Sequence, residues 1–205
     1  MKRIIYSLFF LLACADDKTI SGNDTHDVTD QKTVEQTTPE VEEPIGIIAK
    51  EDCQQINLGD KACNIRLYDQ NNDVWDLYDH LGDVILIDFS TAWCGPCQMA
   101  GHYMQPLQND YQNAGVQIVT ILIDGPIGGQ APTQSDIDDW VNYHNISSAP
   151  VLRGSRELII DSSGVAGYAI SGFPTYLYID RNMKFYAGHT GYSDEYAREK
   201  IDEAL

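Results

Sequence analysis

Runs of apolar residues separated by polar turns predict the first strands of one folded domain. Two short runs, residues 64–68 and 74–77, flank the turn-forming pentad 69–73, and this pattern indicates a hairpin. Residues 84–89 are apolar apart from one acidic residue, which is typical of a buried central strand. Residues 116–123 form a second run of this kind. The sheet is therefore expected to have a buried centre.

Helical spacing and capping residues predict three helices around these strands. Apolar residues recur at near-helical spacing over about residues 96–112, and Gly115 follows as a stop signal. The other expected elements are a helix from Ser135 to His144 with Asp138 as capping-box partner, a hairpin of residues 176–179 and 184–189, and a helix from Ser193 to Leu205. Alternating strands and helices of this order indicate an α/β fold with a mixed sheet.

Charge and composition exclude two broad classes of function. The chain has 205 residues and a formal net charge of −18, of which −14 falls on residues 51–205. A surface this acidic repels phosphate backbones, so nucleic-acid binding is not expected. The hydrophobic content of 43% suits one folded core and is too low for a protein with several membrane spans.

The N-terminus has the pattern of an export signal. Lys2 and Arg3 precede about ten apolar residues, which end in Leu-Leu-Ala before Cys14. This end resembles the bacterial lipobox, so residues 1–13 are expected to be removed and Cys14 to carry the lipid. An ordinary signal peptide with an accidental cysteine is the alternative. Residues 14–50 are acidic and lack aromatic residues, which predicts a disordered tether before a domain at 51–205.

The segment Cys94-Gly95-Pro96-Cys97 is the strongest chemical signal. It follows a predicted buried strand and opens a predicted helix, where unpaired N–H groups and the helix dipole favour a thiolate. Cys94 is therefore expected to attack, and Cys97 is close enough to resolve a mixed disulfide. Gly95 is expected to permit the tight backbone, and Pro96 to pre-set the first helical turn.

Other interpretations of this pair are a static disulfide or a metal site. Zinc needs further ligands, whereas the upstream cysteines Cys53 and Cys63 are ten residues apart. Met99 and His102 follow the pair and raise the question of copper. The pair differs in spacing from the copper carriers that it resembles, which have three residues between their cysteines, so neither a metal nor another cofactor is expected.

Residues 85–97 resemble the active-site strand and turn of thioredoxins. Gly172-Phe173-Pro174-Thr175 resembles the cis-proline loop of the same family, and Gly191 is a weaker third match. The N-terminal hairpin and the export signal resemble the extracytoplasmic TlpA-like branch. The resemblance implies a thioredoxin fold, a mixed central sheet flanked by helices, with an N-terminal hairpin extension and a long insert at 125–173.

The resemblance also implies roles for individual residues. Cys94 would be the nucleophile, Cys97 the resolving thiol and Asp88 the buried acid that carries the proton of Cys97. The sequence agrees, because a carboxylate within an apolar strand has a raised pKa when it lacks a partner. An edge position or a salt bridge for Asp88 is the alternative.

The substrate would contact the residues around the two cysteines. Pro174 would be cis and would present the backbone of Phe173 to an extended substrate strand. Trp93 would shield the sulfurs, unless it is a plain core residue. Gly95 and Pro96 would form the rest of the surface that the substrate contacts.

The remaining cysteines, Cys53 and Cys63, are expected to form a structural disulfide, because exported proteins fold in an oxidising compartment. A second redox relay is the alternative. The 125–173 insert has no assigned role, and it either builds a substrate groove or extends the core.

Together these features predict a lipid-anchored thiol–disulfide oxidoreductase of the bacterial cell envelope, facing the periplasm. The Gly-Pro pair, without His or Lys between the cysteines, predicts a reductase nearer thioredoxin's potential of about −270 mV than an oxidant's of about −120 mV. Its partners would be cysteine-containing exported proteins and a membrane electron donor or thioredoxin-type reductant, and the protein would be a monomer. Ala15 after the lipid-bearing cysteine favours the outer membrane. A thiol peroxidase and a copper-binding or redox-inert module are the alternative functions; in peroxidases of this fold the resolving cysteine lies elsewhere.

Overall fold

The computed structural model describes residues 45–48, 57–159, 167–168 and 170–205. All of these residues belong to one compact unit, Glu42–Leu205. The predicted signal peptide at 1–13, the lipidation site Cys14, most of the 14–50 tether, and Cys53 lie outside the described residues. In the described part, no helix is long and apolar enough to cross a membrane.

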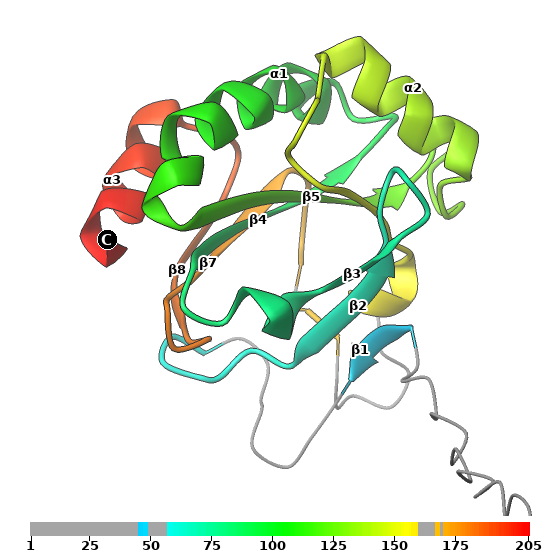
Figure 1. Ribbon diagram of the computed structural model, residues 1–205. Coiled ribbons are helices and arrows are strands. Elements are labelled where there is room, and N and C mark those ends of the chain that lie inside the picture. Colours follow the sequence, from blue (N-terminus) through cyan, green and yellow to red (C-terminus); the bar gives the residue numbers. More distant parts are fainter. Residues whose placement is uncertain (1–44, 49–56, 160–166, 169) are drawn as a thin grey trace, which may run out of the picture. The chain divides into compact units, whose positions relative to one another are not determined.

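A five-stranded mixed sheet forms the centre of the described part (Figure 1). Its strands are, in spatial order, β6 (Val151–Arg153), β5 (Val116–Asp124), β4 (Val84–Thr91), β7 (Thr175–Ile179) and β8 (Phe185–Thr190). β4 runs parallel to β5, and β5 runs parallel to β6. β7 is antiparallel to both β4 and β8. β4 is therefore the central strand, with two neighbours on each side.

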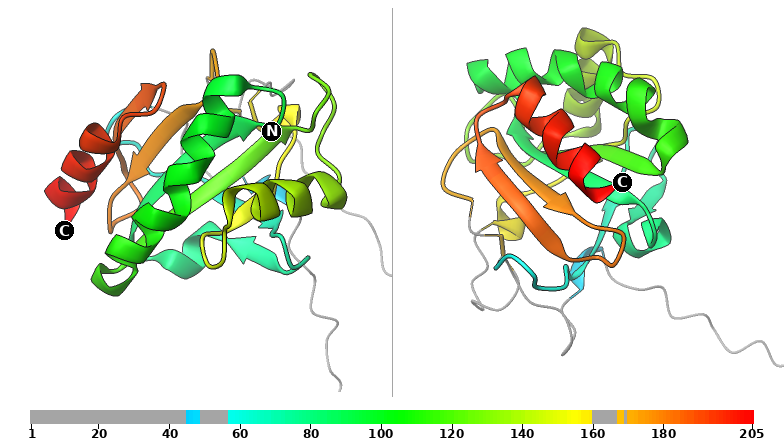
Figure 2. Two further views of the ribbon diagram at one scale, coloured as in Figure 1. Left: turned by 90° about the horizontal axis from the view of Figure 1, so that it is seen from above. Right: turned by 90° about the vertical axis from the view of Figure 1, so that its left-hand side faces the viewer.

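Helices cover one face of this sheet, and a second, smaller sheet covers the other (Figures 1 and 2). The helices are α1 (Gly95–Tyr111), α2 (Gln134–His144) and α3 (Asp194–Ala204), with 3-10 turns η1 (Leu77–His80), η2 (Gln112–Ala114) and η3 (Arg156–Leu158). The second sheet is antiparallel and consists of β1 (Gly46–Ile48), β2 (Asn64–Tyr68) and β3 (Val74–Asp76).

The alternation of side chains along β4 divides the core into two layers. Val84 and Leu86 pack with Met104 and Leu107 of α1. The intervening residues Ile85, Ile87 and Phe89 pack against the second sheet through Ile65, Leu67 and Trp75. Residues two apart on a strand share a face. Asp88 therefore lies on the helix side of the sheet, the side on which α1 begins.

The structure confirms the predicted hairpins, the two buried strands and the terminal helix, whose N-cap is Ser193. Gly115 ends the turn after α1 with a positive φ of 72°, as the stop signal predicted. Three expectations need correction: the cap of α2, the end of the tether and the role of Gly95.

The cap of α2 is Thr133 rather than Ser135, and its capping-box partner is Asp136 rather than Asp138. Thr133 accepts from the Asp136 N–H, whereas Ser135 already lies within the helix. The predicted disordered tether is wrong at its end, because residues 46–48 form β1 on the edge of β2. The third correction concerns Gly95 and is described with the active site.

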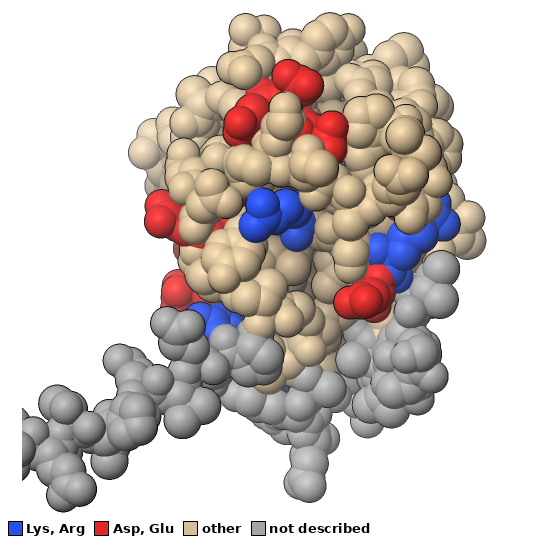
Figure 3. All heavy atoms as spheres, turned by 90° about the vertical axis from the view of Figure 1, so that its right-hand side faces the viewer, with Lys and Arg blue, Asp and Glu red and all other residues tan. Residues whose placement is uncertain are grey.

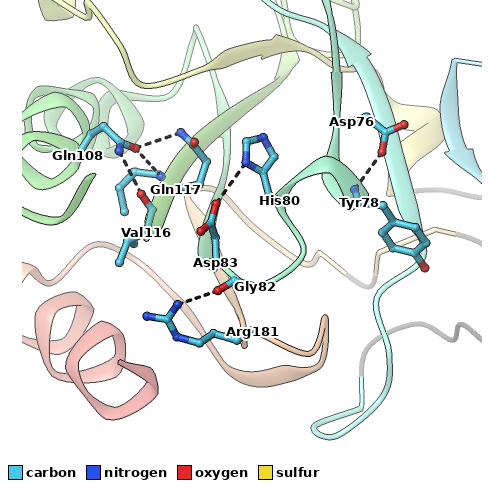
Figure 4. Close-up of polar contacts among 10 residues, drawn as sticks. Asp76, Tyr78, His80, Gly82, Asp83, Gln108, Val116, Gln117 and Arg181 are labelled. Carbon is cyan, nitrogen blue, oxygen red and sulfur yellow. Dashed lines mark hydrogen bonds and ion pairs between the residues drawn. The ribbon is translucent and has the colours of Figure 1, made fainter. Parts of the chain in front are cut away.

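Polar contacts fasten the end of the sheet at which β4 and β5 begin (Figure 4). The Gln108 side chain accepts from Ile118 N at 2.7 Å and donates to Val116 O at 3.1 Å. Arg181 donates to Gly82 O at 2.7 Å, and His80 pairs with Asp83 at 3.6 Å. The loops of the active site lie at the opposite end of the sheet, where β4 and β5 finish.

Candidate active site

Cys94 caps the N-terminus of α1. Its sulfur accepts a hydrogen bond from Cys97 N at 3.4 Å, and its backbone is extended, as is usual for an N-cap. The helix starts here because β4 ends at Thr91, whose carbonyl accepts from Cys94 N, and because Pro96 occupies the first turn. The sulfur thus faces the positive end of the helix dipole.

The two thiols are free and differ in their environment. Cys94 is 6% exposed, whereas Cys97 is completely buried. Burial raises the pKa of the Cys97 thiol, and the adjacent Cys94 and the charge of Asp88 raise it further. Cys97 therefore stays protonated until a base accepts its proton, and Cys94 is the sulfur that a substrate can reach.

Asp88 is the buried acid of this site. It is fully buried in the central strand, so it lies neither at an edge nor in a salt bridge within the described residues. Ser90 donates to its carboxylate at 2.7 Å and Thr120 at 3.3 Å. Burial raises its pKa from 3.8 to about 7, although the hydrogen bonds from Ser90 and Thr120 work in the opposite direction. The expected direction of this shift is confirmed, while the role of proton carrier stays a prediction.

The loop before β7 closes over the attacking sulfur. The peptide bond between Phe173 and Pro174 is cis, as the resemblance implied. Cys94 Sγ donates to Phe173 O at 3.6 Å, and Gly191 N donates to Pro174 O at 2.9 Å. The backbone carbonyl of Phe173 is therefore at the reactive sulfur, where an extended substrate would compete for it.

Trp93 is held in place by a polar network that sequence reasoning missed. Its ring is 48% exposed and meets Phe173 edge-on at 6.4 Å. Its Nε1 donates to the carboxylate of Asp124 at 3.0 Å. The same carboxylate accepts from Gly129 N at 2.9 Å and from two guanidinium nitrogens of Arg156. Trp93 is therefore not a plain core residue.

Arg156 determines the charge state of this network. Burial alone would raise the pKa of Asp124, but hydrogen bonds from Arg156, Gly129 and Trp93 outweigh it and lower the pKa to about 2. Arg156 lies on η3, inside the insert whose role the sequence left unassigned. The only sequence signal was an acidic residue at the end of a buried strand, and its arginine partner is 32 residues away.

Gly95 and Pro96 are the exposed residues between the sulfurs. Pro96 occupies the first turn of α1, as predicted. The steric explanation for Gly95 is wrong: its φ is not positive, and an added Cβ would meet no atom within 4 Å. The missing side chain instead leaves open space beside Cys94.

Cys63 and His102 are two other described residues that the sequence suggested for a disulfide or a metal. Cys63 is disulfide-bonded, whereas its predicted partner Cys53 lies outside the described residues, so the pairing stays a prediction. His102 faces His144, with 3.3 Å between their Nδ1 atoms. Within the described ranges, no group of three or more His, Cys, Asp or Glu side chains is arranged to hold a metal ion.

A reactive dithiol at a helix start, facing a cis-proline loop on a mixed sheet, defines a thioredoxin-like protein. The model of the AhpC/TSA family matches residues 58–186, more than half of the chain, and the chain belongs to this family.

The chain is similar to curated thiol–disulfide oxidoreductases named ResA. That of Oceanobacillus iheyensis is 27% identical over 137 residues, which cover 65% of each protein. That of Bacillus cereus is 24% identical over 160 residues, which cover 78% of this chain and 82% of the relative. These relatives identify the chain as an enzyme of the thiol–disulfide oxidoreductase type.

Solved structures show the same fold. A protein from Chlorobium tepidum, described as a putative thiol:disulfide interchange protein DsbE, has a TM-score of 0.57 and 26% identity over 73% of this chain and 97% of its own. The thioredoxin domain of a thiol-disulfide oxidoreductase from Bacteroides vulgatus has a TM-score of 0.60 and 20% identity, covering 73% of this chain and 99% of its own.

Proposed function

We propose that this protein is a lipid-anchored reductase that opens disulfide bonds of exported proteins in the bacterial envelope. The observation that carries the proposal is the position of Cys94: its sulfur caps α1, lies 3.4 Å from Cys97 N and faces the cis-proline loop. A buried second thiol and a buried acid stand behind it. This arrangement has the parts that two-step thiol–disulfide exchange needs.

The reaction follows from the order of the two sulfurs. The Cys94 thiolate attacks one sulfur of the substrate disulfide, forms a mixed disulfide and releases the other substrate sulfur as a thiolate. Cys97 then loses its proton and attacks Cys94, which releases the second substrate sulfur and leaves a Cys94–Cys97 disulfide. Two electrons pass to the substrate, so an external dithiol reductant must restore the enzyme in each cycle.

Asp88 is suited to the second step. The pKa of Cys97 is raised by burial, so this thiol does not ionise readily at neutral pH. Asp88 interacts with Cys97 electrostatically and has a pKa raised to about 7, so its carboxylate can accept a proton near neutrality and return it. We assign Asp88 the role of proton carrier for Cys97.

The direction of electron flow rests on the surroundings of Cys94. Within the described part, no Lys, Arg or His hydrogen-bonds to its sulfur, and the residues between the cysteines are Gly95 and Pro96. A thiolate that lacks a hydrogen bond from a cationic side chain is stabilised mainly by the helix start, and this favours a reducing pair. A membrane electron donor or a thioredoxin-type reductant would recharge it.

The anchor rests on the sequence of the N-terminus. The h-region ends in Leu-Leu-Ala before Cys14, which supports lipidation at that cysteine, and Ala15 supports the outer membrane. The acidic segment that follows would hold the domain away from the lipid surface, where exported proteins with disulfides are accessible. We expect the domain to act as a monomer.

Equilibration in glutathione buffers tests the proposal. We expect a Cys94–Cys97 potential near −270 mV together with reduction of insulin disulfides by the reduced protein. A potential above about −180 mV, the value of protein disulfide isomerase, would make the protein an oxidant or an isomerase. Failure of the reduced protein to reduce insulin would remove the reductase assignment.

The alternatives give different results in parallel assays. A thiol peroxidase would lose its thiols to hydrogen peroxide far faster than a Cys94→Ser variant, and a copper module would bind Cu(I) tightly through both cysteines. We expect slow peroxide oxidation and no Cu(I) binding stronger than that of the same dithiol in a small peptide.

A further inference from the structure

A groove of about 690 Å³ lies beside the active site, between the first half of α1, helix α2 and the loop after β5. Figure 2 shows α1 and α2 next to each other on the same face of the sheet. Gln98 of α1 and Asp139 and Tyr143 of α2 line the groove, together with Pro126 of the loop. This volume falls within the usual range for ligand-binding sites.

The groove begins at the reactive loop. Ala92, two residues before Cys94, forms part of its wall. The carbonyl of Ala92 accepts a hydrogen bond from Gln98 Nε2 at 2.7 Å, which fixes this wall to the first turns of α1. Trp140, also in the wall, packs in one cluster with Cys94 and Cys97. A chain held at Cys94 can therefore continue into the groove.

The charged groups that line the groove are acidic. Asp136 and Asp139 contribute carboxylates, and none of the described Lys or Arg residues lines it. Asp136 caps its own helix through Thr133, at 2.7 Å to both N and Oγ1. Asp139 is exposed, and its carboxylate has no hydrogen-bond or ion-pair partner in the described part of the chain. Figure 3 shows the face that lies on the right in Figure 1. Acidic residues gather in the upper part of this face, where Figure 1 places α2.

An exposed aromatic ring lies close to the carboxylate of Asp139 along α2. Tyr143 is one turn after Asp139 on α2, is 62% exposed and also lines the groove. A Lys or Arg side chain fits such a site, because its charged group pairs with the carboxylate while it lies against the aromatic ring.

We infer that this groove, formed by α2 and the loop before it together with Ala92 and Gln98, binds a Lys- or Arg-bearing segment of the substrate protein next to the cysteine that Cys94 attacks. The inference rests on the proposed function, and it names the substrate class: exported proteins whose reactive disulfide is flanked by basic residues. The net charge of −14 on residues 51–205 supports the same preference at longer range.

Two variants separate the groove from the general charge. Asp139→Asn and Asp138→Asn each remove one negative charge from adjacent positions of α2. Asp138 is exposed, accepts from Gln134 at 3.0 Å and does not line the groove, so it is the matched control.

The substrates are two peptides with the same intramolecular disulfide, flanked by lysines in one and by glutamates in the other. We expect the wild-type protein to reduce the lysine peptide about tenfold faster at low salt. Asp139→Asn should lower the rate with the lysine peptide about threefold, as for a solvent-exposed ion pair, and Asp138→Asn should change it less than 1.5-fold. Equal rates for the two peptides, or equal effects of the two variants, would overturn the inference.

A binding measurement keeps this test independent of catalysis. Both peptides are also made with serine in place of cysteine, and their affinity for the reduced protein is measured by calorimetry. The lysine form should bind more tightly, with the same dependence on Asp139. Insulin reduction by the wild-type protein reports on the proposed function itself, so a protein that binds lysine peptides but reduces nothing would refute that function and not the groove.

Discussion

Asp88 shows how one buried carboxyl connects stability to chemistry. Burial raises its pKa from 3.8 to about 7. Between pH 4 and pH 7, the carboxyl group is therefore protonated in the folded protein and ionised in the unfolded chain. The folded state is therefore favoured least above pH 7, where the buried group is ionised, and this penalty disappears toward pH 4. The penalty is on the order of 4 kcal/mol.

Asp88→Asn should therefore stabilise the protein at pH 8 and have little effect at pH 4. The amide keeps the shape of the side chain and cannot ionise, so the pH-dependent penalty is absent. Urea unfolding of the reduced protein at pH 4, 6 and 8 measures this difference, with the exposed Asp138→Asn as the control. A constant difference at all three pH values would show that Asp88 does not titrate near neutrality.

The same substitution should slow the resolving step. Without the carboxylate, the proton of Cys97 has no acceptor, so we expect turnover to fall about 10- to 100-fold near pH 7. The difference should shrink at high pH, where hydroxide removes the proton. Stopped-flow measurement of mixed-disulfide decay between pH 6 and 9 gives the profile. An unchanged profile would leave Asp88 with a structural role only.

Arg156 acts on the active site through Asp124. Arg156→Gln removes two donors from a buried carboxylate, and we expect a loss of about 1–3 kcal/mol of stability at neutral pH. Because the pKa of Asp124 is lowered to about 2, this loss should vanish as the pH falls from 4 to 2.

A second expected effect of Arg156→Gln is a more mobile Trp93, visible as a lower fluorescence anisotropy in a Trp75→Phe, Trp140→Phe background, which leaves Trp93 as the one tryptophan. Arg153→Gln is the control, because Arg153 contacts Gln134 and the Tyr68 ring instead of Asp124. Arg156→Lys should retain part of the stability and part of the Trp93 anisotropy of the wild-type protein. An anisotropy unchanged by Arg156→Gln would contradict a positioning role.

At the scale of elements, α1 and α2 meet at a position that has no room for a side chain. A Cβ on Gly101 would lie 2.7 Å from Nε2 of His144, and His144 is itself buried against Trp140 at 4.3 Å between ring centroids. Gly101→Ala should destabilise the protein by about 1–3 kcal/mol despite the better helix propensity of alanine.

A double-mutant cycle tests this contact. His144→Ala removes the obstructing ring, so Gly101→Ala should cost nothing in that background or stabilise slightly. Gly95→Ala, at a position where an added Cβ meets no atom within 4 Å, is the control in the same helix. The same cost for Gly101→Ala with and without His144 would show that the two residues do not clash.

The sequence predicted elements whose signals are local and missed those formed by distant contacts. Val84–Thr91, Val116–Asp124 and the terminal helix carry their own patterns of apolar and capping residues. β6 has three residues and is a strand only because it pairs with β5. β1 also has three residues, and it is a strand only because it pairs with β2.

The active site shows the same division. The cysteines, Asp88 and Pro174 were found because they belong to short motifs. Asp124 and Arg156 were missed because two unremarkable polar residues meet only in the folded chain. The steric explanation for Gly95 was wrong because a glycine's spacing in a sequence does not reveal its φ.

At the scale of the molecule, the disulfide of Cys63 bears on the chain that precedes the hairpin. We expect non-reducing peptide mapping to recover one cross-linked fragment that contains Cys53 and Cys63, with Cys94 and Cys97 free after mild reduction. A fragment that joins Cys63 to Cys14 would refute both the pairing and the lipidation of Cys14.

Membrane attachment is a separate property of the whole chain. Cys14→Ser should abolish lipidation and move the protein from the membrane to the soluble fraction of the cell envelope. The Cys94→Ser variant, which removes the active thiol and keeps the anchor, should remain with the membrane. A Cys14→Ser protein that still fractionates with membranes would show that another segment holds it there.

The exchange mechanism is tested most directly by trapping its covalent intermediate. A Cys97→Ser variant, expressed in cells and isolated after acid quenching, should accumulate mixed disulfides that dithiothreitol releases, each joined to Cys94. The Cys94→Ser and the double variants should accumulate none, because Cys97 is completely buried. Mixed disulfides formed equally by Cys94→Ser, or none with Cys97→Ser, would contradict an exchange reaction in which Cys94 attacks and Cys97 resolves.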